Sequence, residues 1–162
     1  MKERGENKLN RKWILLITAL LLSMQLLPAQ AAGEAAVKEM EAYLDFVDYG
    51  GATMLPEQIP AEDWKRFFVI DARDADQYAA SHIPGAVNIE WRQVLARRAE
   101  LPKEQAILIY CNTGSLSAQA GFALRVAGMD NVRILQGGFS EWKSKGGFDA
   151  YRRFVEAQQK TK

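Results

Sequence analysis

The chain of 162 residues contains one cysteine and one histidine. A single cysteine excludes a disulfide within the chain and a redox pair of the Cys-x-x-Cys type. One cysteine and one histidine are also too few for a zinc site of Cys and His ligands, although Asp and Glu could add to them. We therefore expect no metal and no cofactor. Cys111 is either a small buried apolar side chain or a reactive thiol.

An excess of basic residues is also missing, because 21 Lys and Arg stand against 20 Asp and Glu. Residues 1–31 hold five of the basic and two of the acidic residues, which leaves sixteen and eighteen and a net charge of −2 beyond residue 31. Such a charge gives no basic surface for nucleic acid. The length and the 48% of hydrophobic residues suit one ordinary domain.

The N-terminus differs in character from the rest of the chain. A polar, basic stretch over residues 1–12 precedes an uncharged apolar run from Trp13 to Pro28, and Ala29-Gln30-Ala31 follows. This order is typical of a secretory signal peptide cleaved after Ala31, and it predicts an exported protein of the periplasm. The apolar run is about the shortest that spans a bilayer, so a membrane anchor that is not cleaved is the alternative.

Segments typical of strands and of helices alternate beyond this region. Strands are expected at 52–55, 67–73, 86–89, 106–110 and 131–136, and helices at 35–49, 74–82, 91–100, 116–128, 137–146 and 148–159. The alternation predicts an α/β fold with a mostly parallel central sheet and helices on both faces. The expected organisation is a signal peptide (1–31), an N-terminal helical lead-in (32–51), a main domain (52–147) and a C-terminal helix and tail (148–162).

Cys111 follows the strand expected at 106–110, at the edge of a parallel sheet where active sites lie. The loop after it reads CNTGSLS, in which Gly114 permits a tight turn and successive N–H groups can converge on an anion. The following helix points the positive end of its dipole back at the sulfur. Both effects favour a thiolate. The candidate nucleophile is Cys111, and the candidate substrate-binding residues, acting mainly through N–H groups, are Asn112, Thr113, Gly114, Ser115, Leu116 and Ser117.

The loop narrows the chemistry that such a thiolate can perform. His82 lies in a turn-like SHIPGA segment, which is a poor setting for the base of a Cys–His hydrolase. A cysteine phosphatase needs an Arg six residues after the nucleophile to clamp phosphate, but Ser117 stands there. Sulfur transfer needs neither group, because a thiolate can attack a sulfane sulfur directly and hold it as a persulfide.

Three segments resemble a rhodanese domain in order and register: FVIDARDADQYAASHIPGAVNI, ILIYCNTGSLSAQA and VRILQGGFSEWKSKG. The resemblance runs from about Phe67 to Gly146, and the whole chain is similar to a single-domain, exported rhodanese (thiosulfate sulfurtransferase). It implies about five parallel strands and thiosulfate:cyanide sulfurtransferase activity, with Cys111 as the persulfide carrier. The implied donor is a small sulfane-sulfur compound such as thiosulfate, and the implied acceptor is cyanide, a small thiol or a protein thiol.

The chain departs from the family where many members carry Arg directly after the cysteine and again four residues later. Asn112 and Leu116 stand at these positions. Because Arg there would help to bind the sulfonate of thiosulfate, another persulfide donor is an alternative. We expect Asp71 and Arg73 to form a structural ion pair or to hold loops near the site. A catalytically silent binding module and a redox protein that pairs Cys111 with a partner thiol remain alternative functions.

Overall fold

The computed structural model describes residues 31–48, 50 and 52–161, and it divides into two units, one up to Asp45 and one from Phe46. Residues 31–46 are helical, whereas the sequence predicted a helix at 35–49. Residues 1–30 of the predicted signal peptide lie outside the described residues. Within the described ranges, no helix is long and apolar enough to cross a membrane.

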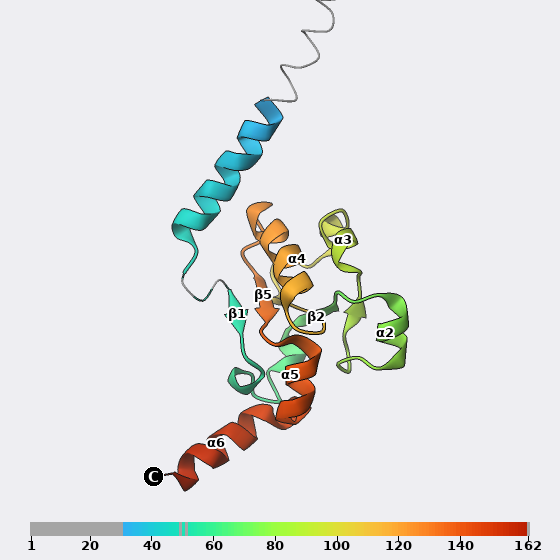
Figure 1. Cartoon of the computed structure of the whole chain (residues 1–162), viewed down its shortest axis with the longest axis vertical. Coiled ribbons are helices and arrows are strands. Elements are labelled where there is room, and N and C mark those ends of the chain that lie inside the picture. Colours follow the sequence, from blue (N-terminus) through green and yellow to red (C-terminus); the bar gives the residue numbers. More distant parts are fainter. Residues whose placement is uncertain (1–30, 49, 51, 162) are drawn as a thin grey trace, which may run out of the picture. The chain divides into compact units, whose positions relative to one another are not determined.

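The larger unit is built on a five-stranded sheet in the order β1-β5-β4-β2-β3, in which every pairing is parallel (Figure 1). The strands are β1 (Thr53–Met54), β2 (Phe68–Asp71), β3 (Val87–Asn88), β4 (Ile107–Tyr110) and β5 (Val132–Leu135). The prediction of a parallel α/β fold with about five strands is confirmed. The strands are short, and β4 is at the centre, between β5 and β2.

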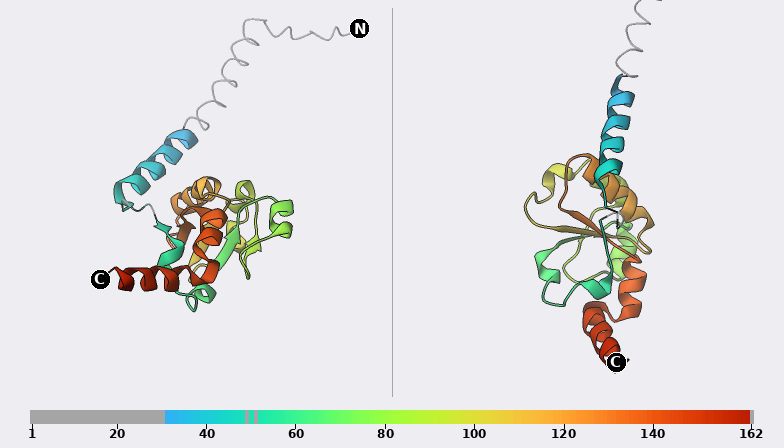
Figure 2. Two further views of the ribbon diagram at one scale, coloured as in Figure 1. Left: turned by 60° about the horizontal axis from the view of Figure 1, so that its bottom comes forward. Right: turned by 90° about the vertical axis from the view of Figure 1, so that its left-hand side faces the viewer.

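The helices of this unit connect the strands and follow the last of them. They are α2 (Ala75–Ala80), α3 (Trp91–Val94), α4 (Ser115–Val126), α5 (Gly138–Lys145) and α6 (Ala150–Lys160). Short 3₁₀ helices cover Pro56–Gln58, Trp64–Arg66, Arg98–Glu100 and Gly147–Asp149. Helix α4 packs on β4 and β5 and beside α3, whereas α6 leads away from the sheet to the C-terminus (Figure 2).

Both faces of the sheet are covered, because the side chains of each strand alternate between two cores. Ile70 and Ile109 point to one core, which is completed by Val94 of α3 and Leu124 of α4. The opposite core holds Val69, Leu108 and Tyr110. It is completed by Ile59, which follows the first 3₁₀ helix, by Trp64 of the second, and by the partly buried Tyr78, Phe139 and Trp142 of α2 and α5. Such burial on both faces explains why β2 and β4 are almost entirely apolar.

The helix predicted at 91–100 is wrong in its length. Only Trp91–Val94 is α-helical, and the chain then tightens into the 3₁₀ turn Arg98–Glu100. Leu101, which is buried in the same core as Val94, must turn inward at this point. Pro102 follows, and a residue before proline favours the extended backbone that Leu101 adopts.

Candidate functional site

Cys111 directly follows β4 at the carboxyl edge of the sheet, and it is 2% exposed. Ala72, which follows the neighbouring strand β2, donates its N–H to the carbonyl of Tyr110 at 2.8 Å. The thiol thus emerges between the ends of two central strands. Helix α4 begins four residues later, with Gly114 as its N-cap.

The loop closes around the sulfur of Cys111. Gly114 has a φ of 101°, a left-handed conformation that favours glycine, and it donates its N–H to Sγ at 3.2 Å. The hydroxyl of Ser117, in the first turn of α4, lies 3.6 Å from Sγ and 3.0 Å from the carbonyl oxygen of Gly114. Backbone and side chain therefore present hydrogen-bond donors to one buried sulfur.

These donors set the protonation state of the thiol. Burial raises the pKa of Cys111, but hydrogen bonds from the N–H and the hydroxyl of Ser117 and from the N–H groups of Thr113 and Gly114 lower it. The hydrogen bonds outweigh the burial, so the pKa lies below the ordinary value of a cysteine. The thiolate is the reactive form of a cysteine side chain, and a lowered pKa favours that form.

The predicted binding residues divide into two groups. Ser117 is buried and Gly114 is half-buried against the sulfur, whereas the other four residues are exposed: Asn112, Thr113, Ser115 and Leu116. The amide of Asn112 does not turn to the sulfur but donates to the side-chain oxygen of Gln77 at 3.1 Å. The exposed residues thus form the rim of the site.

Asp71 and Arg73 form a buried ion pair at the end of β2, with Nη2 of Arg73 2.6 Å from the carboxylate. The Tyr110 hydroxyl donates to the same carboxylate at 2.7 Å and accepts the N–H of Ile83 at 3.0 Å. Arg73 also donates to the carbonyl of Ser81 at 2.6 Å. Burial, followed by the hydrogen bond to Asp71, raises the pKa of Tyr110, which stays a neutral donor. The network ties the α2 connection to the strands beside Cys111.

A second loop supports the cysteine loop from the other side. Gly138, with a φ of 58°, begins α5, where Phe139 and Ser140 donate their N–H groups to the carbonyls of Cys111 and Asn112 at 2.8 and 3.0 Å. A Cβ on Gly138 would meet the backbone of both residues. The close approach of the two loops therefore requires glycine.

Sequence reasoning missed three contributions to this arrangement: the Tyr110 hydroxyl, the Ser117 hydroxyl and the α5 N–H groups. In the sequence, no pattern distinguishes Tyr110 from an ordinary core residue, and none marks the hydroxyl of Ser117 at the start of a helix. The third had a signal in the adjacent glycines of LQGGF.

His82 stacks on Tyr78, with ring centroids 4.0 Å apart, and its Nδ1 lies 2.9 Å from the Tyr78 carbonyl. In the described part of the chain, no three His, Cys, Asp or Glu side chains gather as a metal site.

Known proteins resemble the domain that holds this site. The family model described as "Rhodanese-like domain" matches residues 52–145. The chain is 30% identical over 93 residues to the uncharacterized protein YqhL of Bacillus subtilis, covering 57% of this chain and 73% of YqhL. It is 36% identical over 91 residues to thiosulfate sulfurtransferase GlpE of Pseudomonas entomophila, covering 55% and 82%. Two longer relatives, named as adenylyltransferases and sulfurtransferases, are matched over 20% and 24% of their lengths.

A solved structure agrees with these sequence relatives. The rhodanese-like domain of the Anabaena protein Alr3790 superposes with a TM-score of 0.54 at 28% identity, covering 59% of this chain and 76% of that chain. The sequence resemblance to the rhodanese family is thereby confirmed. The relatives that are named sulfurtransferases support that activity in general terms.

Replacing Tyr110 by Phe tests the buried network. The variant leaves the N–H of Ile83 without its acceptor and removes one donor from the Asp71 carboxylate, so we expect a loss of about 1–3 kcal/mol in the free energy of unfolding. Urea denaturation measures it. Tyr151→Phe, at an exposed position on α6, is the control and should change stability by less than about 0.5 kcal/mol. Equal effects of the two variants would contradict this account.

Replacing Gly138 by Ala tests the contact between the two loops. The new Cβ would press on backbone that cannot move aside, and the left-handed φ adds strain, so we expect a loss of about 2–4 kcal/mol. Gly128→Ala is the matched control, because Gly128 has a φ of 88° and nothing within 4 Å of an added Cβ. Its loss should stay near 1 kcal/mol. Denaturation midpoints that fall equally for both variants would contradict the close contact between the Gly138 turn and the cysteine loop.

Proposed function

Because this chain belongs to the rhodanese-like domain family, we propose that it is a sulfurtransferase whose Cys111 carries sulfane sulfur as a persulfide. The observation that carries the proposal is the set of hydrogen-bond donors around Sγ, which lowers the pKa of a buried thiol. A structural cysteine in an apolar core would have the opposite shift. GlpE, a relative matched over 82% of its length, is named a thiosulfate sulfurtransferase.

In the proposed reaction, the Cys111 thiolate attacks the outer sulfur of the donor. With thiosulfate, the new bond joins Sγ to that sulfur, the donor S–S bond breaks, and sulfite leaves with the bonding electron pair. The enzyme then holds Cys–S–S⁻. Cyanide attacks the terminal sulfur, thiocyanate leaves, and the Cys111 thiolate is restored. A small thiol or a protein thiol can replace cyanide as the acceptor.

The loop is suited to negative charge on the sulfur of Cys111. The N–H groups of Thr113, Gly114 and Ser117 compensate the negative charge on Sγ, and the N-terminus of α4 adds its positive dipole end. No proton has to be removed from the nucleophile, so the reaction needs no general base. His82, which stacks on Tyr78, has no part in it.

Export to the periplasm is part of the proposal and rests on residues 1–31 alone. A basic stretch, a short apolar run and Ala29-Gln30-Ala31 stand in the order that signal peptidase substrates share. In an oxidising compartment Cys111 has no second cysteine in its own chain with which to form a disulfide. The mass of the protein recovered from the periplasm would show whether these residues are removed; retention of all of them would favour a membrane anchor.

Mass spectrometry of the intact protein under non-reducing conditions tests the sulfur carrier. After incubation with thiosulfate or with an alkyl persulfide, we expect a gain of one sulfur atom that cyanide removes. Cys111→Ser should gain none, because the chain has no other thiol. A wild-type protein with a free thiol that accepts sulfur from neither donor would point instead to a catalytically silent binding module.

The pH dependence of the thiol tests the hydrogen bonds. A lowered pKa means that alkylation of Cys111 becomes fast at a lower pH than for a free cysteine. Ser117→Ala removes a donor to the sulfur, so the rate should rise only at higher pH, with the midpoint displaced upward. Ser144→Ala is the matched control on α5, where the hydroxyl bonds the carbonyl of Glu141. Identical profiles of the two variants would remove Ser117 from the mechanism.

A further inference from the structure

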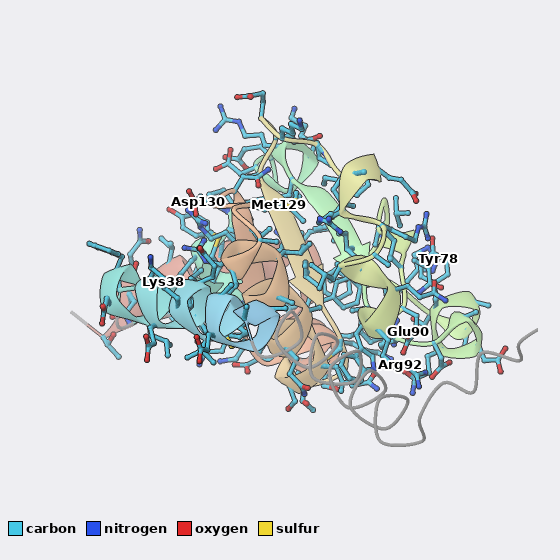
Figure 3. The ribbon with its side chains drawn as sticks, turned by 90° about the horizontal axis from the view of Figure 1, so that it is seen from above. Lys38, Tyr78, Glu90, Arg92, Met129 and Asp130 are labelled. Carbon is cyan, nitrogen blue, oxygen red and sulfur yellow. The ribbon has the colours of Figure 1, made fainter. Side chains whose placement is uncertain are left out.

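Two arginines meet at the turn that joins α4 to β5, which carries Met129 and Asp130 (Figure 3). Nη1 of Arg125 donates to the carbonyls of Asp130 and Val132 at 3.0 and 3.2 Å. Nη1 of Arg133 donates to the same two carbonyls, each at 2.9 Å. Because both Nη1 atoms contact the same two oxygens, the two positive guanidinium groups lie side by side.

The short edge strand explains why these arginines bond to backbone. Strand β1 pairs with β5 only at Ile134 and Leu135, so the carbonyl of Val132 precedes the paired stretch. A backbone oxygen in such a position needs a donor from elsewhere, and the guanidinium groups provide it. A neutral carbonyl fixes a guanidinium group without cancelling its charge.

Both arginines line a cavity of about 350 Å³ beside β1. The other polar residues that line it are Asp48, Thr53 and Gln58. Oε1 of Gln58 accepts the N–H of Leu55 at 2.8 Å, so the amide nitrogen is the end that can donate to a ligand. Among the described residues, two guanidinium groups stand against one carboxylate in the lining, which leaves an excess of positive charge.

Arg133 keeps donors for a ligand, because a guanidinium group has five N–H bonds and Nη1 alone contacts the carbonyls. Its Nε and Nη2 make no hydrogen bond to any residue that the structure describes. The side chain is half-buried and already held by backbone. A guanidinium group that is fixed in this way loses little freedom when it binds an anion.

We propose that this cavity binds a tetrahedral oxyanion of the phosphate or sulfate type. Two guanidinium groups side by side repel each other, and an anion between them removes the repulsion. Guanidinium groups also match oxyanions with pairs of N–H bonds. A tetrahedral ion has enough oxygens to contact both arginines and the amide of Gln58, whereas a carboxylate has only two. The proposal is independent of the chemistry at Cys111.

A titration followed by NMR of the backbone amides tests the site residue by residue. Sodium phosphate and sodium sulfate are added separately to the isotope-labelled full chain, with sodium chloride at the same ionic strength as the reference. We expect the signals of Thr53, Val132, Arg133 and Ile134 to shift and to saturate with phosphate and with sulfate. Acetate should saturate only at a higher concentration, and chloride should not saturate.

Variants of Arg133 isolate the cavity. Arg133→Gln should raise the phosphate concentration at half-saturation by about tenfold, as expected when charge-assisted hydrogen bonds are lost. Arg133→Lys keeps the charge without the fork of donors, so its half-saturation should lie between the two. Arg98→Gln is the matched control, because Nη1 of Arg98 also donates to a backbone carbonyl, that of Leu95 at 3.1 Å. It should leave half-saturation unchanged, and the amide spectrum shows that each variant keeps its fold.

Three results would overturn the proposal: saturable shifts confined to residues 111–117, equal saturation by chloride, and equal effects of Arg133→Gln and Arg98→Gln. Glycerol phosphate identifies the source of the oxyanion. Saturation at a lower concentration than inorganic phosphate supports a phosphate ester as the ligand, and saturation at an equal or higher concentration supports the free ion. The loading of Cys111 with sulfur is measured separately, so the sulfurtransferase function stands or fails on its own.

Discussion

The site depends on hydrogen bonds that lower the pKa of a buried thiol. Burial alone would keep Cys111 protonated and inert. The turn at Gly114 reverses this, because it brings the N–H groups of residues 113, 114 and 117 and the Ser117 hydroxyl to one atom. The left-handed φ of Gly114 makes the turn possible, and the start of α4 adds its dipole in the same direction. The proposed chemistry of the chain depends on this one compensation.

The rest of the carboxyl edge keeps that turn in place. The buried group of Asp71, Arg73 and Tyr110 connects β2, β4 and the α2 connection through short hydrogen bonds. The N–H groups at the start of α5 hold the carbonyls of Cys111 and Asn112 from the other side. A buried network of this kind is strong only when every member is satisfied. The loop therefore stays in a geometry that a free peptide of the same sequence would not keep.

The fold could be predicted from the sequence because strands that are buried on both faces are continuous apolar runs, as β2 and β4 are. It also located Cys111, since the end of a central parallel strand is defined by chain order. Helix length after Trp91 was not predictable, because the inward turn of Leu101 depends on a core that several distant segments build. The Tyr110 hydroxyl and the Ser117 hydroxyl carry no local signature, and their partners lie on other elements or across a turn. The periodicity of apolar residues carries no information about such hydrogen bonds.

The most direct measurement is the ionisation of Cys111 itself. The ultraviolet absorbance of the thiolate, followed against pH in the wild-type protein with Cys111→Ser as the baseline, reports a single group because the chain has one cysteine. The account predicts a midpoint clearly below that of a free cysteine measured in the same buffer. A midpoint at or above the free value would show that burial prevails over the hydrogen bonds of the loop, and would contradict the thiolate mechanism.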